Sequence, residues 1–378
     1  GLPEALLEPA PHAALDLARR YARTHAPFTA EALAERYGLG RAIAEGLLKE
    51  LVNGGRLLEG DFRPGGTGRE WCDPDVLQTI RRRSLAKLRH QVEPVEPAVL
   101  GRLITHWQGV VRRRSGLDAL LDAIEGLQGA PLIASLLETE ILPARVEGYQ
   151  PSDLDALTTA GEVVWGGLEP LGEHDGRLAL YLTDHVAKLR REPTLSDLPE
   201  RERVILAHLE QHGASFFATL HEAAGGGYPG DTVDAIWTLV WAGAITNDSL
   251  HAVRAFTRPA DQRSRKPKAR AAHRTFRSRR QAPPTAEGRW SLMTARAGAK
   301  VSATEAATAL AQQLLARYGV LTREVAAVEN IAGGFSAVYN ILKALEDAGR
   351  IRRGYFASEV GATQFALPAA LDLLRSLK

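Results

Sequence analysis

The seven-residue stretch LEDAGRI, residues 345–351, holds a pattern that occurs four times in the chain. A leucine is followed by three residues, a glycine, one more residue and a β-favouring aliphatic. The other copies are LVNGGRL (51–57), LTTAGEV (157–163) and LVWAGAI (239–245). The leucine closes the apolar face of a helix, the glycine suits the left-handed position after it, and the aliphatic residue enters a strand. A helix that leads directly into a short hairpin is the last step of a winged helix, so the four copies predict an array of such domains.

Helical patterns precede each copy, so we predict a mainly α chain with small β-hairpins. This is an α+β fold of tandem winged-helix, or helix-turn-helix, domains. The predicted parts are winged helix 1 (1–73), a basic helical connector (74–115), winged helix 2 with its β-hairpin (116–192), winged helix 3 (193–256), a basic linker (257–289) and winged helix 4 (290–378).

The composition indicates a cytoplasmic protein with several cores. The 378 residues are 45% hydrophobic, which is enough for two to four domains. The single cysteine, Cys72, excludes a disulfide framework and a cysteine-based zinc site, and it fits a reducing compartment. The sequence shows no signal peptide and no apolar run of the roughly 20 residues that span a membrane, so we expect no membrane partner.

The net charge of +2 hides one strongly basic segment. Residues 257–289 contain eleven Lys or Arg and two Asp or Glu, which gives +9 against −7 for the remainder. Such a segment without apolar periodicity is typical of a linker that contacts phosphate. The alternative is a flexible connector that its charge keeps soluble.

The fourth copy offers the strongest candidate DNA contacts. A winged helix usually places its third helix in a groove and its wing on the nucleic-acid backbone. We predict contacts from the outward face of the helix and from the wing; a solvated hairpin or a protein-binding surface is the alternative. The candidates are Ser336, Asn340, Lys343, Arg350, Arg352, Arg353 and Tyr355.

Two basic clusters and a tryptophan between them are weaker candidates. The clusters could face phosphate or simply water. Trp107 could stack on an unpaired base, although a tryptophan in an apolar stripe more often packs in a core. The clusters are Arg81, Arg82 and Arg83, and Arg112, Arg113 and Arg114.

The residues alone indicate no enzyme active site. The sequence contains no Walker A motif and no helicase motor motif, and its eleven histidines lack metal-ligand spacing. We therefore predict no metal site and no cofactor within this chain.

Long strings of the chain, in order, resemble the C-terminal region of the Lhr, or large helicase-related, proteins of bacteria, and the likeness covers almost the whole chain. The strings are REWCDPDVLQTIRRRSLAKLRHQVEPV (69–95), ASLLETEILPARVEGYQPSDLDALTTAGEVVWGG (134–167), LLARYGVLTREVAAVENIAGGFSAVYNILKALEDAGRIRRGYF (314–356) and QFALPAALDLLR (364–375).

This resemblance implies a role beside the motor domains of a DNA helicase. Lhr proteins are superfamily 2 DNA helicases that use ATP, with Mg²⁺, to move on single-stranded DNA, and they are linked to DNA repair. Their C-terminal extension is an array of winged helices with a β-barrel module, tied to oligomerisation. The resemblance thus implies a piece of a longer protein at the bacterial nucleoid. Its implied partners are single-stranded or forked DNA, the helicase core of the same protein and further copies of itself.

The resemblance also implies an enzymatic alternative, because the extension is similar to AlkZ-type DNA glycosylases and has been tied to uracil-DNA glycosylase activity. Those enzymes position water with a Gln-x-Gln or Gln-x-Asp pair. The nearest string here is Gln128-Gly129-Ala130, so only Gln128 carries over as a weak catalytic candidate. Alanine cannot do acid–base chemistry, and a glycosylase needs a placed amide or carboxylate at the sugar.

The favoured hypothesis is therefore a DNA-binding winged-helix region that holds DNA beside a helicase motor, with the joining of subunits as a second expected role. An AlkZ-like uracil-DNA glycosylase domain is the first alternative, and an oligomerisation scaffold is the second.

Overall fold

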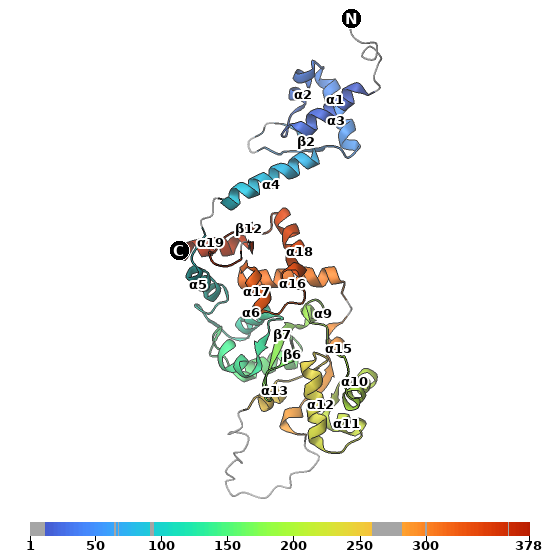
Figure 1. Cartoon of the computed structure of the whole chain (residues 1–378), viewed down its shortest axis with the longest axis vertical. Coiled ribbons are helices and arrows are strands. Elements are labelled where there is room, and N and C mark those ends of the chain that lie inside the picture. The colour runs from blue at the N-terminus through green and yellow to red at the C-terminus, as the bar shows by residue number, and fades with distance from the viewer. Residues whose placement is uncertain are drawn as a thin grey trace. The chain divides into compact units, whose positions relative to one another are not determined.

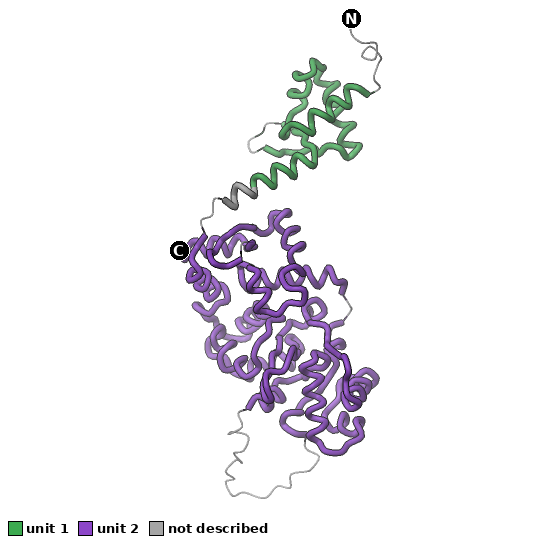
Figure 2. Tube along the Cα trace, viewed as in Figure 1, with its two compact units in different colours: residues 1–93 green, residues 94–378 purple. Residues whose placement is uncertain are grey.

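The computed structural model describes residues 12–63, 66, 68–90, 94–258, 282–298, 301–361 and 363–378. The chain divides into two compact units, residues 1–93 and 94–378 (Figure 2). Each unit is described by itself.

The first unit is a winged helix with a long helix after its wing. Phe28 pairs with Trp71, so a single bridge replaces the first strand of the usual sheet. The Thr29 side chain accepts a hydrogen bond from the backbone N–H of Ala32 and caps the second helix. The elements are α1 (Ala13–Thr24), α2 (Ala30–Tyr37), α3 (Arg41–Asn53), β1 (Leu58–Gly60), β2 (Glu70–Cys72) and α4 (Pro74–His90).

The second winged helix opens the second unit. Its three-stranded sheet has the order β4-β7-β6, and a parallel pair of short strands, β3 and β5, lies beside it. The elements are α5 (Pro97–Trp107), β3 (Arg114–Ser115), α6 (Leu117–Leu127), β4 (Leu132–Ile133), α7 (Ala134–Leu136), a π-helical turn (Leu137–Ile141), β5 (Val146–Glu147), α8 (Pro151–Ala160), β6 (Val163–Pro170), β7 (Gly176–Leu182), a 3₁₀ turn (Thr183–His185) and α9 (Val186–Leu189).

The third winged helix draws its last strand from beyond the basic segment. β10 pairs with both β8 and β9, so residues that we had assigned to winged helix 4 complete the third sheet. The boundary at residue 290 is corrected accordingly. The elements are α10 (Glu200–His212), β8 (Ser215–Phe216), α11 (Phe217–Ala223), α12 (Pro229–Trp241), β9 (Ile245–Asn247), α13 (His251–Phe256), a 3₁₀ turn (Pro284–Ala286), β10 (Arg289–Leu292) and α15 (Met293–Ala297).

The described ends of the predicted linker, residues 257–258 and 282–289, therefore both lie on the third winged helix. Most of the linker, residues 259–281, lies outside the described residues. On either side of that stretch, α13 packs against the 3₁₀ turn Pro284–Ala286, and the Trp237 indole donates a hydrogen bond to the Thr285 carbonyl at 2.9 Å. Both ends of the basic segment are thus anchored to the third winged helix.

The fourth winged helix has the same strand order as the second and third. In all three, the strand after the first long helix pairs with the last strand, which pairs with the middle one. The elements are α16 (Ala303–Tyr318), β11 (Val320–Leu321), α17 (Arg323–Val328), α18 (Ser336–Asp347), β12 (Arg352–Gly354), β13 (Gln364–Ala366) and α19 (Pro368–Ser376).

The four repeated glycines adopt the conformation that the sequence predicted. Their φ angles are 67° at Gly55, 80° at Gly161, 74° at Gly243 and 73° at Gly349. Each ends the helix that precedes the hairpin, where a side chain would be strained. The tandem winged-helix fold is therefore confirmed.

The second winged helix lies between the fourth and the third in the second unit (Figure 1). One hydrophobic core runs through the second and third domains, from Leu120 to Trp290. Their contact is very close, because a Cβ at Gly167 would lie 2.2 Å from the Val240 carbonyl oxygen of α12, and one at Gly176 would lie 2.5 Å from the Trp241 ring. The β6–β7 hairpin thus lies directly on α12.

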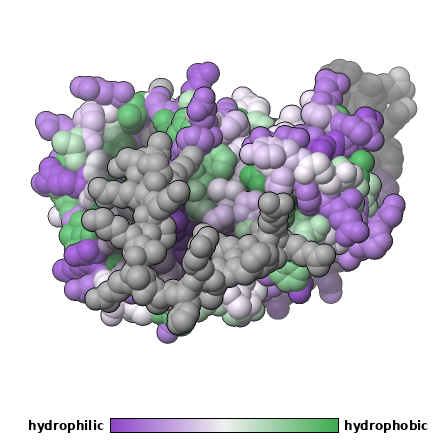
Figure 3. Space-filling model, turned by 90° about the horizontal axis from the view of Figure 1, so that it is seen from below, coloured by the Kyte–Doolittle hydropathy of each residue, from purple (hydrophilic) through white to green (hydrophobic). Residues whose placement is uncertain are grey.

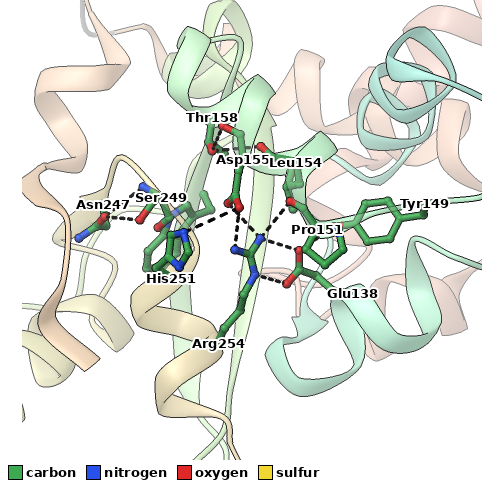
Figure 4. A network of polar contacts seen from close by, with 11 residues as sticks. Glu138, Tyr149, Pro151, Leu154, Asp155, Thr158, Asn247, Ser249, His251 and Arg254 are labelled. Carbon is green, nitrogen blue, oxygen red and sulfur yellow. Dashed lines mark hydrogen bonds and ion pairs between the residues drawn. The ribbon is translucent and has the colours of Figure 1, made fainter. Parts of the chain in front are cut away.

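A polar network lies at the edge of the contact between the second and third winged helices (Figure 4). Arg254 of α13 reaches into the second domain and binds Glu138 at 2.6 Å and Asp155 at 2.8 Å. The Tyr149 hydroxyl donates to Glu138 at 2.6 Å. Although burial opposes the charge on Arg254, its hydrogen bonds with the two carboxylates raise its pKa. The third winged helix is therefore held to the second by both core packing and ion pairs.

The predicted connector, residues 74–115, divides at the unit boundary. α4 belongs to the first unit, whereas α5 packs against α16 and α19 of the fourth winged helix. The Trp107 indole donates a hydrogen bond to the Ala316 carbonyl at 2.7 Å. α5 thus joins the second and fourth winged helices, which the sequence did not indicate because the partners are far apart along the chain.

Over the described ranges, no helix is both long and apolar enough to pass through a bilayer. Figure 3 shows the end of the second unit opposite the fourth winged helix, where hydrophilic and hydrophobic residues are interspersed on the visible described surface.

Candidate nucleic-acid interface

α18 has one buried and one exposed face. Val338 and Leu342 are fully buried in the core of the fourth winged helix. Helical periodicity then turns Ser336, Asn340 and Lys343 outward, and all three are exposed. The structure therefore brings the three predicted helix contacts together on one accessible face.

The wing supplies cations beside this helix. Arg350 is exposed just before β12, Arg352 is half-buried within β12, and Tyr355 is 41% exposed just after it. The Tyr355 hydroxyl accepts a hydrogen bond from the Glu359 backbone N–H at 3.1 Å, which fixes the ring on the wing loop. Arg350 and Tyr355 are thus accessible to a ligand, and Arg352 is partly so.

Arg353 has a different position from its neighbours. Its guanidinium donates to the Tyr339 hydroxyl at 3.3 Å and lies 3.6 Å from the carboxylate of Glu346, whose side chain is 2% exposed. Both partners belong to α18. Arg353 therefore ties the wing to the helix, with part of its charge already neutralised by Glu346.

A buried glutamine holds the wing loop in one shape. Gln364 is fully buried; its carbonyl oxygen accepts from the N–H groups of Phe356 and Ala357, and its amide donates to the Gly361 carbonyl at 3.1 Å. Val95 pairs with the same loop through the Phe356 carbonyl at 2.8 Å and the Ser358 N–H at 2.9 Å. The loop is thus pre-organised from both sides.

A groove of about 880 Å³ runs beside the first turns of α18. The twelve-residue helix begins there, and its N-terminus carries partial positive charge although the N–H groups of Ala337 and Val338 donate to the carbonyls of Gly334 and Phe335. Hydroxyl, amide and guanidinium groups in such a groove suit phosphate oxygens and base edges. Its polar lining includes Arg323, Glu324, Ser336, Tyr339, Asn340 and Thr363.

The two predicted arginine clusters lie in different units. Arg81, Arg82 and Arg83 are exposed on α4 of the first unit, and Arg112, Arg113 and Arg114 are exposed in the second. Arg113 donates to the Pro143 carbonyl at 3.3 Å, and Arg114 lies 2.5 Å from Asp122. Arg112 has no carboxylate partner among the described residues.

In the first unit, cations on α3 and on the wing are paired with carboxylates. Arg41 at the start of α3 lies 2.8 Å from both Glu31 and Glu45, and Arg69 of the wing lies 2.9 Å from Glu59. Because these cations already have carboxylate partners, this surface offers less free positive charge to phosphate than the fourth winged helix does.

Trp107 and Gln128, the two remaining candidates, occupy fixed positions. Trp107 is half-buried, so it is neither wholly in a core nor free at the surface. Gln128 is 1% exposed; its carbonyl oxygen accepts from the Leu182 N–H at 3.0 Å, and its amide lies 3.0 Å from His185 Nδ1. The Gln128 side chain therefore has a structural role at the end of β7.

Sequence reasoning missed the residues that shape the site. Tyr339, Glu346 and Gln364 fix the wing and α18, and only the polar Gln364 within an apolar strand gave a signal. Among the described residues, no three His, Cys, Asp or Glu side chains come together as a metal site.

The comparisons with known proteins agree with this architecture. A family model described as "Large helicase-related protein, winged-helix domain" matches residues 300–378, and a second one with the same description matches residues 95–183. These ranges cover the fourth winged helix and the α5-to-β7 region that contacts it.

Two curated proteins match the whole chain. An "Lhr helicase/ probable uracil glycosylase" of Mycolicibacterium smegmatis is 40% identical over 386 residues, and an "Lhr helicase/uracil glycosylase" of Escherichia coli is 34% identical over 416 residues. The chain spans 25% and 26% of the length of these two relatives.

Proposed function

Since the chain belongs to the large helicase-related (Lhr) family as its C-terminal winged-helix region, we propose that it binds DNA through the fourth winged helix. The observation that carries this proposal is the groove beside α18, in which a helix N-terminus, a fixed wing and exposed polar side chains meet. The third helix would enter a groove of the DNA while the wing follows the backbone.

Free positive charge supports the same surface. Lys343 and Arg350 are exposed and have no carboxylate partner among the described side chains. Each cation that neutralises a phosphate releases a counterion, so binding weakens as salt rises. Ser336 and Asn340 add hydrogen bonds to backbone or base edges.

The basic segment supports a second contact. Residues 257–289 carry a net charge of +9 by sequence, and their described ends are anchored to the third winged helix. A cationic segment of this kind adds non-specific affinity for the phosphate backbone. We expect its removal to lower affinity for all DNA forms by a similar factor.

The DNA held in this way would be the single-stranded or forked DNA on which a motor of the same protein acts. We propose that ATP and Mg²⁺ serve that motor, outside this chain, and that the whole protein acts in DNA repair. Support comes from the family and from the helicase names of the two relatives.

Fluorescence anisotropy over a salt series tests the proposal. The double variant Lys343→Ala/Arg350→Ala is compared with Arg102→Ala/Lys188→Ala, which removes two exposed cations elsewhere in the same unit. We expect the first variant to bind about tenfold more weakly and to lower the salt slope by about 2, and the second to resemble the wild type. Wild-type protein that shows no salt-dependent binding, or two variants that weaken equally, would contradict it.

Glycosylase activity is a second candidate, favoured only by the names of the two relatives. The one residue that matched the glycosylase motif, Gln128, is buried and hydrogen-bonded. A role in positioning water at a sugar would require it to leave these contacts. We therefore expect this chain to form no abasic sites in a uracil-containing oligonucleotide, and cleavage after alkali treatment would show the opposite.

A further inference from the structure

A second pocket lies where the second and fourth winged helices meet. It has a volume of about 260 Å³ and is enclosed by α5, α6 and α16 together with the segment around Arg145. This volume lies just below the usual range of small-molecule sites. Its polar and aromatic lining consists of Trp107, Gln108, Arg112, Arg114, Asp122, Arg145 and Arg317.

The pocket has an excess of positive charge. Arg114 pairs with Asp122 at 2.5 Å, and Arg317 pairs with Glu329. Arg112 and Arg145 have no carboxylate partner in the part of the chain that the structure describes.

Arg145 is held in place by neutral groups. Its guanidinium donates to the Ile141 carbonyl at 2.9 Å and to the Gln108 side-chain oxygen at 2.5 Å. Burial lowers the pKa of this guanidinium. A half-buried cation that has only neutral acceptors and lines a pocket is suited to bind an anion.

An aromatic wall stands beside these cations. The Trp107 indole N–H donates to the Ala316 carbonyl at 2.7 Å. Its ring lies against Gly319, where a Cβ would come within 3.1 Å of the ring atoms and where φ is +67°. The ring is therefore fixed in place and remains part of the pocket wall.

A fixed indole next to uncompensated guanidinium groups matches a ligand that joins a flat ring to an anion. A nucleotide has both parts, since its base can stack on an aromatic ring and its phosphate can bind arginine. We propose that this pocket binds one unpaired nucleotide of a DNA strand, with the base on Trp107 and the phosphate on Arg112 and Arg145. This inference rests on the proposed DNA-binding function.

The surroundings favour a nucleotide within a strand over a free one. Arg113 follows Arg112 along the chain, is exposed and has no carboxylate partner among the described residues. It offers charge to a phosphate next to the bound nucleotide, which a free mononucleotide lacks. An unpaired tail is the favoured source, because a base within a duplex must be unpaired and unstacked before it can enter a pocket.

The test compares a blunt hairpin with the same hairpin that carries a short single-stranded tail, at one salt concentration. The full chain, Arg112→Ala and Arg102→Ala are measured; Arg102 is an exposed arginine on α5 outside the pocket. Arg112 is exposed as well, so neither change threatens the fold. We expect the tail to improve wild-type affinity about tenfold, Arg112→Ala to lose most of that gain, and Arg102→Ala to keep it.

Photo-crosslinking locates the base. A 5-iodouracil in the tail should attach to the peptide that contains Trp107, and 5-iodo-dUMP at the same concentration should not. A tail that adds no affinity, a gain that Arg112→Ala leaves intact, or labelling of Trp107 by the free nucleotide alone would each overturn the inference. If the blunt hairpin still binds in those cases, the proposed function stands; if neither DNA binds, both fail.

Discussion

α12 and α18 occupy the same place in two winged helices of this chain, yet they are used in opposite ways. α12 buries seven of its residues, among them Trp237 and Trp241, whereas α18 buries three. The β6–β7 hairpin covers Val240 and Trp241 near the C-terminal end of α12, and the residues that α12 leaves exposed include Asp231 and Asp234. The outward face of α18 instead carries Ser336, Asn340 and Lys343 at the surface. We therefore expect α18, and not α12, to contact DNA.

The different surroundings of α12 and α18 each have a local structural cause. Gly167 and Gly176 have no side chain, so β6 and β7 can lie directly against α12. Hydrophobic contact between the two domains then replaces solvent. In the fourth winged helix, the wing is instead fixed to α18 by Arg353 and to Val95 by backbone hydrogen bonds, which leaves the groove open.

The largest expected effect comes from disrupting the contact between α12 and the β6–β7 hairpin. Gly167→Ala would place a methyl group 2.2 Å from the Val240 carbonyl oxygen, so the hairpin and α12 must move apart. We expect a loss of about 3 kcal/mol or more in the free energy of unfolding, measured by urea denaturation. Gly101→Ala is the control, because its Cβ would meet nothing within 4 Å on helix α5; it should change stability by roughly 1 kcal/mol or less, in the stabilising direction.

The next effect removes the ion pairs at the edge of the same contact. Arg254→Met leaves Glu138 and Asp155 half-buried without their shared cation. We expect it to destabilise the second unit by about 2 kcal/mol in thermal unfolding. Arg203→Met removes an arginine whose pair with Glu200 is exposed, and it should cost well under about 1 kcal/mol. Equal losses in the two variants would contradict a special role for Arg254.

A smaller effect is expected for the two wing arginines beside α18, Arg350 and Arg353. Arg353→Met removes a partner of Glu346 and Tyr339, so we expect about 1.5 kcal/mol of destabilisation together with weaker DNA binding. Arg350→Met removes an exposed cation and should weaken DNA binding while stability stays within about 0.5 kcal/mol. Thermal unfolding and anisotropy on both variants distinguish the positioning arginine from the contacting one.

The smallest effect concerns the core between α9 and the hairpin. Burial raises the pKa of Tyr181 to about 12, whereas a tyrosine in the unfolded chain ionises near pH ~10. Both states are neutral below that pH, so the stabilising contribution is complete there and is lost as pH rises toward the folded pKa. We expect wild-type protein to lose about 1 kcal/mol more than Tyr181→Phe between pH ~9 and pH ~10.5. Parallel loss in the two proteins would show that Tyr181 does not contribute.

The sequence predicted most local structure but not the long-range pairing. The four leucine–glycine patterns located each helix end and the strand after it, because those signals lie within seven residues. β10 was missed as part of the third sheet, since nothing near residue 290 indicates that it pairs with Ile245–Asn247 across the basic segment. Residues 257–289, which lie in the sequence between two paired strands of the third sheet, were therefore interpreted as a linker between domains.

The candidate site shows the same limit. Helical periodicity was enough to place Ser336, Asn340 and Lys343 on one face of α18. It did not separate Arg353 from Arg350, because their difference depends on which residue meets Tyr339 and Glu346 in the folded domain. Nor did it place Trp107 beside Ala316, a contact that joins two separate helices.

Hydrogen exchange with and without a forked DNA tests most directly whether α18 rather than α12 meets DNA. Mass spectrometry would follow peptides from residues 336–347, 350–363 and 229–241 in the full chain. The account predicts slower exchange in the first two segments when DNA is bound and no change in the third. Protection of residues 229–241, with α18 and the wing unchanged, would contradict it.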